Sequence, residues 1–486
     1  MNASRQILVL WYFLCLLLLL MLLEWLRGAS VVLPGLPGLR ESLTGLLLAK
    51  SGQAILTAVL SLWFFALMWI DVRDRAGFPE QGYRRSLTWC DLCKMYLVAV
   101  AILVFAVGKS SLPESPNLQS FRLGIDQSTN VLVLLAGIVL SQMVAVILHR
   151  SEEEALWLRR TMVVFFILFF TAASLVHSDL PFEYKYHTQP RWSGLWVNPN
   201  TYGLFMGAGI VLVAGCFFRN QVFSVQIPRN SERGAQSAKF RSWFETVFLL
   251  VAGGMMAFGL VKSYSRGAWA GAAAGVLYLA VQAIRGKPAF LASWVYRNLL
   301  ILATMIISIG LLSFWHFKET ERTVARRVFS VANANDFSWR NRLTAWEGSL
   351  QMMMERPWFG FGWNQSEPAY EQYYRPVQVP DGLAIETNDY LMLGTTLGIP
   401  ALVFFLAYIS RSLLRKAECR RESADLDWWG TVCRAGTLVL LVGFWFDGGL
   451  FRMATATLFW VLLELGRTSG AIQSRQPSTV AEGQTP

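Results

Sequence analysis

Residues 129–148, TNVLVLLAGIVLSQMVAVIL, form an apolar run that contains no charged side chain. About 20 residues of this kind are needed for a helix to cross the hydrocarbon core of a bilayer. Similar windows recur along the whole chain, in which hydrophobic residues make up 54% and charged residues 15%. The sequence therefore predicts an all-α, polytopic membrane protein rather than a soluble domain with an anchor.

Hydropathy predicts about twelve transmembrane helices. They are expected near Gln6–Leu26, Ala54–Ile70, Leu92–Val107, Thr129–Leu148, Thr161–His177, Tyr202–Phe218, Trp243–Val261, Ala268–Ile284, Val295–Phe314, Asp389–Ile409, Thr431–Phe446 and Leu450–Leu465. The chain then divides into helices one to nine (1–316), a large loop (317–388), helices ten to twelve (389–466) and a disordered tail (467–486).

Basic residues orient these helices. One set of connections is rich in cations, among them Lys94, Arg159 and the run from Arg411 to Arg421, and the opposite short connections carry few. The positive-inside rule then places both termini in the cytoplasm and the large loop outside. The net charge of +11 is spread over these connections, which argues against a nucleic-acid partner. Cys90 and Cys93 form a CxxC without further ligands nearby, and no metal or cofactor is expected.

The large loop is the one long polar segment between two apolar spans, so we expect the specific chemistry there. Its residues Phe337–Arg356 place Leu343, Trp346, Leu350 and Met353 at helical spacing. This spacing predicts an amphipathic helix that lies along the membrane surface or caps the spans. Pro357 is expected to end the helix, and the glycines of Phe359–Gly362 predict a turn.

Three arginines are expected on the outer side of the membrane: Arg191 before the sixth span, Arg266 at the start of the eighth and Arg342 in the loop helix. Taken singly, each could anchor its helix at the headgroup layer. Together, and with Asn200 close to Arg191, they favour an anionic site, because guanidinium binds phosphate bidentately and stays charged. A lipid diphosphate is the anion expected at that depth.

Acids, amides and aromatic residues mark the point where the loop returns to the membrane. Glu386 and Asp389 are candidate general bases for activating a sugar hydroxyl. Asn388 and Tyr390 beside them, and Trp346 in the loop helix, are candidate substrate-binding residues. For most acids of the loop, exposure to solvent is the simpler interpretation. Interfacial aromatic belts explain much of the tryptophan content as well.

Several short motifs together resemble the O-antigen ligase and polymerase family of bacterial inner-membrane proteins. They are R-x-x-x-W and P-x-x-G-x-G (Arg342, Trp346, Pro357, Gly360, Gly362), N-D-Y-L and G-x-x-x-L (Asn388–Leu391, Gly398–Leu402), SRGAW (Ser265–Trp269) and R-x-x-G…NPN (Arg191, Gly194, Asn198–Asn200). Each is weak alone, and their order around one long outer loop carries the resemblance.

The resemblance implies a metal-independent glycan transfer of the GT-C kind at the periplasmic face of the inner membrane. The donor would be a saccharide on undecaprenyl diphosphate, and a glycan or lipid acceptor would attack its anomeric carbon. Arg191 and Arg266 would hold and stabilise the diphosphate as it leaves, with Arg342 assisting. Partners would be these two substrates and membrane lipids, without nucleotide or nucleic acid.

One position departs from the family pattern. The ligase branch has histidine before the asparagine of H-N-x-Y-L, and this chain has Thr387. Threonine cannot act as a base near neutral pH, so either Glu386 or another acid takes that role, or the chain is not a lipid A ligase. Polymerisation of a repeat unit stays open. Transport of a small solute such as bicarbonate, or a non-catalytic place in a polysaccharide assembly machine, are the competing hypotheses.

Overall fold

The computed structural model describes residues 50–76, 87–107, 130–149, 152–176, 185–186, 189–196, 198–223, 232–286, 337–363, 365–376, 388–414 and 424–467. Its helices are α3 (Lys50–Ala76), α4 (Trp89–Val107), α6 (Asn130–Leu148), α7 (Glu152–Ser174), α8 (Pro199–Phe223), α9 (Glu232–Ser263), α10 (Arg266–Gly286), α13 (Phe337–Glu355), α14 (Ser366–Ala369), the π-helical turn η4 (Tyr370–Tyr374), α15 (Asp389–Leu397), α16 (Ile399–Leu413), α17 (Ala424–Phe446) and α18 (Met453–Leu465). Two short antiparallel strands, β1 (Lys185–Tyr186) and β2 (Gln189–Pro190), accompany them.

Seven helices in the described ranges are long and apolar enough to cross a membrane. The all-α, polytopic membrane fold predicted from the sequence is therefore confirmed. The expected spans Gln6–Leu26 and Val295–Phe314 lie outside the described residues, as does the expected tail beyond residue 467.

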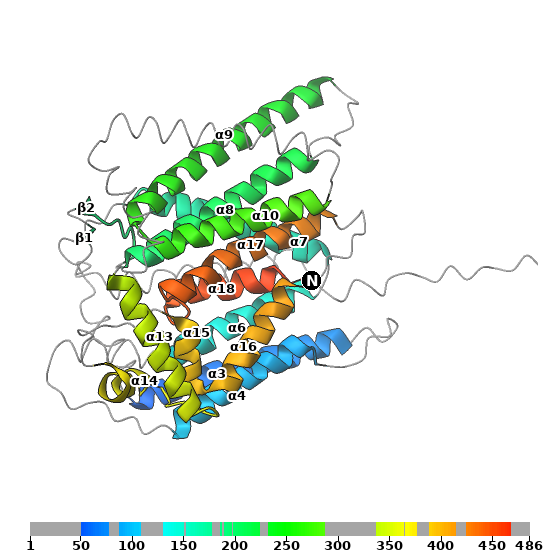
Figure 1. Cartoon of the computed structure of the whole chain (residues 1–486). Helices are drawn as coiled ribbons and strands as arrows, with labels where there is room; N and C mark the ends of the chain where they lie inside the picture. The colour runs from blue at the N-terminus through cyan, green and yellow to red at the C-terminus, as the bar shows by residue number, and fades with distance from the viewer. Residues whose placement is uncertain are drawn as a thin grey trace, which may run out of the picture.

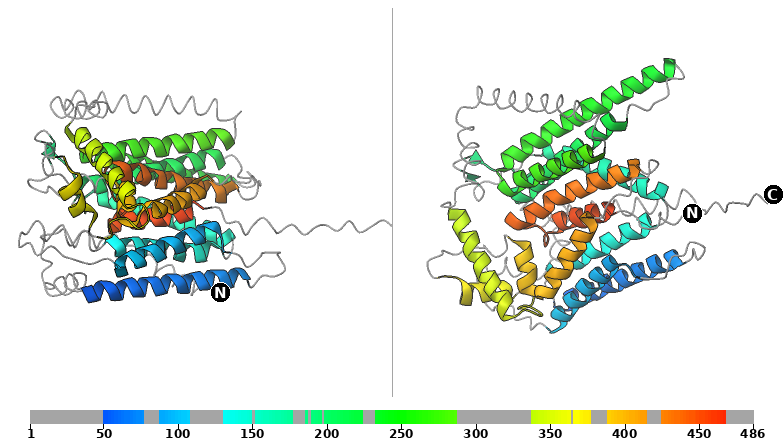
Figure 2. Two further views of the ribbon diagram at one scale, coloured as in Figure 1. Left: turned by 60° about the horizontal axis from the view of Figure 1, so that its bottom comes forward. Right: turned by 45° about the vertical axis from the view of Figure 1, so that its right-hand side comes forward.

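The spanning helices lie side by side, with α9 at one edge and α3 and α4 at the other (Figure 1). α17 packs on α8 and α10, and α18 packs on α6, so these two last helices occupy the middle of the bundle. α13 crosses the ends of the spanning helices instead of running with them (Figures 1 and 2). We call this end of the bundle, where α8, α10 and α18 begin, the site face.

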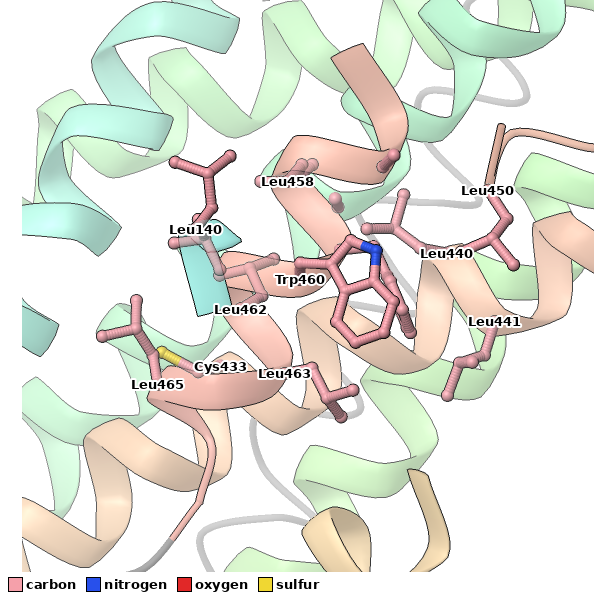
Figure 3. Packing of buried hydrophobic residues seen from close by; sticks show 14 of the residues in the cluster. Leu140, Cys433, Leu440, Leu441, Leu450, Leu458, Trp460, Leu462, Leu463 and Leu465 are labelled. Atoms are coloured by element: carbon pink, nitrogen blue, oxygen red, sulfur yellow. The ribbon is translucent and has the colours of Figure 1, made fainter. Parts of the chain in front are cut away.

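The middle of the bundle is closely packed around Trp460 of α18. Its indole is fully buried among leucines of α17 and α18 (Figure 3). A Cβ atom added at Gly137 of α6 would lie 2.1 Å from Trp460 Cδ1. Glycine is therefore what allows α6 to approach α18 this closely, since the side chains of a packed interior leave no room for another atom.

The expected span Asp389–Ile409 is two helices, which corrects the prediction of one continuous helix. α15 ends at Leu397 and α16 begins at Ile399. Gly398 between them has a φ of 91°, in the region where glycine is unstrained and other residues are not. A Cβ atom at Gly398 would also lie 2.4 Å from the carbonyl oxygen of Trp358.

The loop after α13 holds this break together, and we call its residues Pro357–Gly362 the α15 clasp. Three backbone hydrogen bonds join it to the two helices: Phe361 N to Thr395 O (2.8 Å), Gly362 N to Thr396 O (3.1 Å) and Ile399 N to Pro357 O (2.7 Å). The last carbonyls of a helix have no partner within the helix. The clasp supplies partners for two of them and thereby gives the P-x-x-G-x-G motif a structural function.

α13 confirms the amphipathic helix expected in the large loop, and it ends before Pro357 as predicted. Its apolar face is divided, however: Met353 is buried, whereas Leu343 and Leu350 are 50% and 53% exposed. The turn η4 packs back on α13. Its last residue, Tyr374, donates a hydrogen bond to Glu355.

A chain of buried polar side chains lies at the end of the bundle opposite the site face. Lys94 Nζ lies 2.9 Å from Glu464 Oε2 and 3.2 Å from Gln142 Oε1, and both charged side chains are at most 1% exposed. Gln142 Nε2 donates to Asp71 (3.1 Å), which also contacts His149 (2.9 Å). Lys94, expected among the loop cations, is thus inside the protein. Burying a charge costs several kcal/mol (order of magnitude) unless it is paired, so this chain of partners fixes how α3, α4, α6 and α18 meet.

Arg159 of α7 was also expected in a loop and is also buried. Its Nε donates to Leu465 O (2.8 Å), and Arg434 of α17 donates through Nη1 to Gly466 O (2.8 Å). Both cations therefore bind the carbonyl end of α18, where a positive charge is favoured by the helix dipole.

Candidate functional site

The turn between α17 and α18, residues 447–452, brings the site face together, and we call it the hub turn. Gly448 and Gly449 within it have φ of 68° and 146°, so the chain reverses where other residues would be strained. Three of the remaining residues, Asp447, Leu450 and Arg452, form hydrogen bonds with different parts of the bundle. The described contacts of the site can be followed outward from these three.

Asp447 joins the start of α10 to the loop helix α13. Its Oδ2 accepts a hydrogen bond from Ser265 Oγ (2.7 Å), and its Oδ1 lies 3.3 Å from Nη2 of Arg342. A Cβ atom at Gly267 would lie 2.4 Å from Asp447 Oδ2. The small residues on either side of Arg266 in the SRGAW motif are therefore the ones that let this carboxylate approach the helix.

Arg266 is the first residue of α10 and is 9% exposed. Ser265 before it caps the helix, since its Oγ accepts from Ala268 N (3.2 Å). A cation at the N-terminus of a helix faces the positive end of the dipole, which is unfavourable by roughly 0.3–1 kcal/mol at exposed sites and more where solvent is excluded. An arginine in this place favours an anion nearby.

Arg191 is tied to the end of α9 and to the start of α8. Its Nε donates to Ser263 O (2.8 Å) and its Nη2 to Asn200 Oδ1 (2.5 Å). Ser265 N in turn donates to Ser263 Oγ (3.2 Å), so Arg191 is held two residues away from the group that binds Asp447. Arg191 and Asn200, which lie close together in the sequence, are thus in direct contact.

α15 begins at the other side of the hub turn. Asn388 is its N-cap, and Asn388 Oδ1 accepts from the backbone N of Tyr390 (3.1 Å) and Leu391 (3.2 Å). The Nδ2 of the same side chain is buried and has no hydrogen-bond partner among the residues that the structure describes. Asp389 Oδ2 accepts from Leu450 N (2.7 Å), so this carboxylate holds the backbone of the hub turn.

Two of the predicted aromatic residues meet on Trp445 of α17. The rings of Trp346 and Trp445 lie 5.3 Å apart at 64°, and those of Tyr390 and Trp445 lie 5.7 Å apart at 43°. The hydroxyl of Tyr390 donates to Leu441 O (2.8 Å). Trp445 is 40% exposed, so this aromatic group has a face that a sugar ring could contact.

The structure thus brings most of the predicted residues to one face. Arg342 contacts Asp447, Arg266 directly follows the serine that donates to Asp447, and Asp389 binds the backbone of the same turn. Glu386 lies outside the described residues. The sequence analysis singled out neither Asp447 nor Arg452 as a candidate site residue. A D-G-G signal directly after an apolar span could have drawn attention to both.

Among the described residues, no group of three or more His, Cys, Asp or Glu side chains could hold a metal ion. Residues 251–406 match the family model described as O-antigen ligase. This match covers about a third of the chain and supports the resemblance to the O-antigen ligase/polymerase family. The match supports glycan transfer of the O-antigen ligase type in polysaccharide biosynthesis, and the matched region contains Arg266, Arg342 and the α15 clasp. No curated protein matches the chain.

Proposed function

We propose that the protein transfers a glycan from undecaprenyl diphosphate to an acceptor hydroxyl at the site face. The observation that carries the proposal is that Arg191, bonded to the start of α8, Arg266, at the start of α10, and Arg342, in contact with Asp447, all lie at the site face. An amphiphilic donor would present its diphosphate at the depth where these helices begin. Guanidinium groups suit that anion because they donate two parallel hydrogen bonds to phosphate oxygens.

In the proposed reaction the acceptor oxygen attacks the anomeric carbon, and the bond from that carbon to the diphosphate oxygen breaks. The diphosphate leaves with the electron pair of the broken bond, and the arginines stabilise the charge that develops on it. Fixed cations in a water-poor site act strongly on such a charge. Since they can supply this stabilisation, we propose a transfer that requires no metal.

The proton of the acceptor hydroxyl passes to a carboxylate. Asp389 is engaged with Leu450 N, which favours a positioning role for it. Glu386 precedes Asn388 by two residues, so their Cα atoms are at most about 7 Å apart, and it remains the candidate base. We assign the buried Nδ2 of Asn388 and the ring of Tyr390 to binding of the sugars, together with Trp346.

The positive-inside distribution supports a place in the bacterial inner membrane with both termini in the cytoplasm and the site face in the periplasm. Thr387 in place of histidine favours neither ligation nor polymerisation, so both remain within the proposal. Lipid A would be the acceptor in the first case and a growing polysaccharide in the second.

Transport of a small ion is a second candidate function, which is favoured by the buried row of hydrogen-bonded polar side chains that links His149 to Glu464. Ionisable residues inside a membrane protein commonly mark an ion or proton pathway. The described contacts among these polar side chains, however, all lie at the end of the bundle opposite the site face. They also hold the packed helices together.

Reconstitution with a lipid-linked donor tests the proposal. Purified protein in vesicles would receive undecaprenyl diphosphate-linked oligosaccharide and an acceptor, and a gel would report glycan length and attachment. A ladder of products would indicate a polymerase, and a single shift on lipid A a ligase. If a panel of such donors stayed intact while the vesicles became permeable to bicarbonate, the transport candidate would replace the transferase.

A further inference from the structure

Arg452, the last residue of the hub turn, is a fourth arginine at the site face, and nothing above assigns it a function. It directly precedes α18, and it makes no side-chain cap for that helix. Its side chain is partly buried, between the classes of core and surface residues. The sequence motifs that indicate the family end well before it, at residue 402.

The contacts of Arg452 leave most of its hydrogen-bonding capacity unused. Nη1 lies 3.3 Å from Oγ1 of Thr201, a neutral and buried hydroxyl. Among the described residues, no carboxylate lies within ion-pair distance of it. A guanidinium has five N–H donors and always carries its charge, so a single long bond to a hydroxyl does not compensate it.

The position of Thr201 connects Arg452 to the proposed diphosphate site. Thr201 follows Asn200 in the first turn of α8, and Asn200 is the residue that binds Arg191. The same turn of helix therefore holds two arginines, one through each of two adjacent side chains. Asp447, which contacts Arg342, is five residues before Arg452 in the hub turn.

Its placement is also unfavourable in the absence of an anion. Arg452 stands at the N-terminus of α18, where the helix dipole repels a cation, whereas Arg159 and Arg434 bind the other end of the same helix, where a cation is favoured. A residue that served only the packing of α18 would gain nothing from a positive charge at this end.

We infer that Arg452 binds the diphosphate of the lipid-linked donor, opposite Arg191 across the first turn of α8. The inference rests on the proposed function and adds a residue to it. Arg452 acts on the anion and not on the packing of the helix, so the charge is what the site requires of it. Thr201 positions the guanidinium.

Thermal unfolding can distinguish a role of Arg452 in anion binding from a role in helix packing. The full-length protein in detergent would be unfolded with inorganic pyrophosphate or undecaprenyl diphosphate as the probe. We expect both probes to raise the unfolding midpoint of the wild type. Arg452→Gln should weaken their apparent affinity by about tenfold or more, as the loss of a charge-assisted bond does. The affinity of Arg452→Lys for the probes should lie between those of the wild type and Arg452→Gln. Thr201→Val should lose less affinity than Arg452→Gln. Without a probe, the midpoint of Arg452→Gln should stay at the wild-type value or rise.

Arg356→Gln is the matched control, because Arg356 lies on the same side of the protein and its guanidinium is over the ring of Phe361 (4.5 Å). It should bind both probes as the wild type does. A wild type that responds to neither probe would contradict the proposed function itself. Equal responses of the wild type and Arg452→Gln, or a midpoint of Arg452→Gln that is lowered without any probe, would overturn the inference about Arg452 alone.

Discussion

The close packing of the α15 clasp against α15 predicts how much stability the protein loses when Gly360 is replaced by alanine. This glycine has a φ of 63°, and a Cβ atom built on it would lie 2.4 Å from Thr395 O and 2.6 Å from Thr396 C. Both neighbours are backbone atoms at the end of α15, so neither can turn aside as a flexible side chain would. Substituting alanine must therefore push the clasp away from the helix.

Two contributions give the size of the effect. A residue other than glycine in the left-handed region costs roughly 1–2 kcal/mol. Moving the clasp also weakens the bonds from Phe361 N to Thr395 O and from Gly362 N to Thr396 O, each of which contributes roughly 0.5–1.5 kcal/mol. We expect Gly360→Ala to lower the free energy of unfolding by about 3 kcal/mol, and to loosen α15 and with it Asn388.

Thermal or denaturant unfolding of the purified protein would measure this loss. Gly254→Ala in α9 is the control, because a Cβ atom there meets nothing within 4 Å. In a helix it should be neutral or stabilising, by up to roughly 1 kcal/mol. Equal stability of Gly360→Ala and Gly254→Ala would refute the reasoning about the clasp.

Three further predictions concern buried and paired groups. Lys94→Met should lower the free energy of unfolding by roughly 1–3 kcal/mol, because Gln142 Oε1 loses its donor while Glu464 keeps Tyr408 and Arg467 as partners; a neutral variant in a denaturant titration would contradict this. Asp447→Asn should keep the fold but lower the transfer rate by roughly 10²–10³, and unchanged kinetics would remove Asp447 from the site. Partial burial and the bond to Glu355 raise the pKa of Tyr374 to about 12. Because this pKa is above the value near 10 of an unfolded tyrosine, the stabilisation is complete below pH 10 and is lost as the pH rises toward 12; Tyr374→Phe should abolish that dependence in unfolding curves at alkaline pH.

The sequence predicted the fold class and most spans because long apolar windows are a strong local signal. It could not predict the break at Gly398, because the residues on both sides are apolar and a hydropathy window averages over a single glycine. The need for a break is set by the clasp, which is about 40 residues earlier in the chain. Contacts of that kind are tertiary, and hydropathy does not record them.

The positions of buried charged residues also depend on tertiary contacts that the sequence pattern does not record. The positive-inside rule counts Lys94 and Arg159 as loop cations because they lie near the ends of spans, yet both are buried against partners on distant helices. The sequence did predict that the three arginines share the outer side of the membrane, from their positions next to spans or in the loop helix. It could not predict that Asp447 joins Ser265, next to Arg266, to Arg342, because these contacts cross 182 and 105 positions of sequence.

The most direct test of the central claim is the rate at which undecaprenyl diphosphate is released from a lipid-linked oligosaccharide in vesicles. The wild type, Arg191→Gln and Arg266→Gln would be compared, with Arg356→Gln as a control on the same side of the protein. We expect release by the wild type and the control, and a rate lower by roughly 10²–10³ in the other two variants, whose folding is verified by unchanged unfolding midpoints. Full rates in Arg191→Gln and Arg266→Gln would contradict the account.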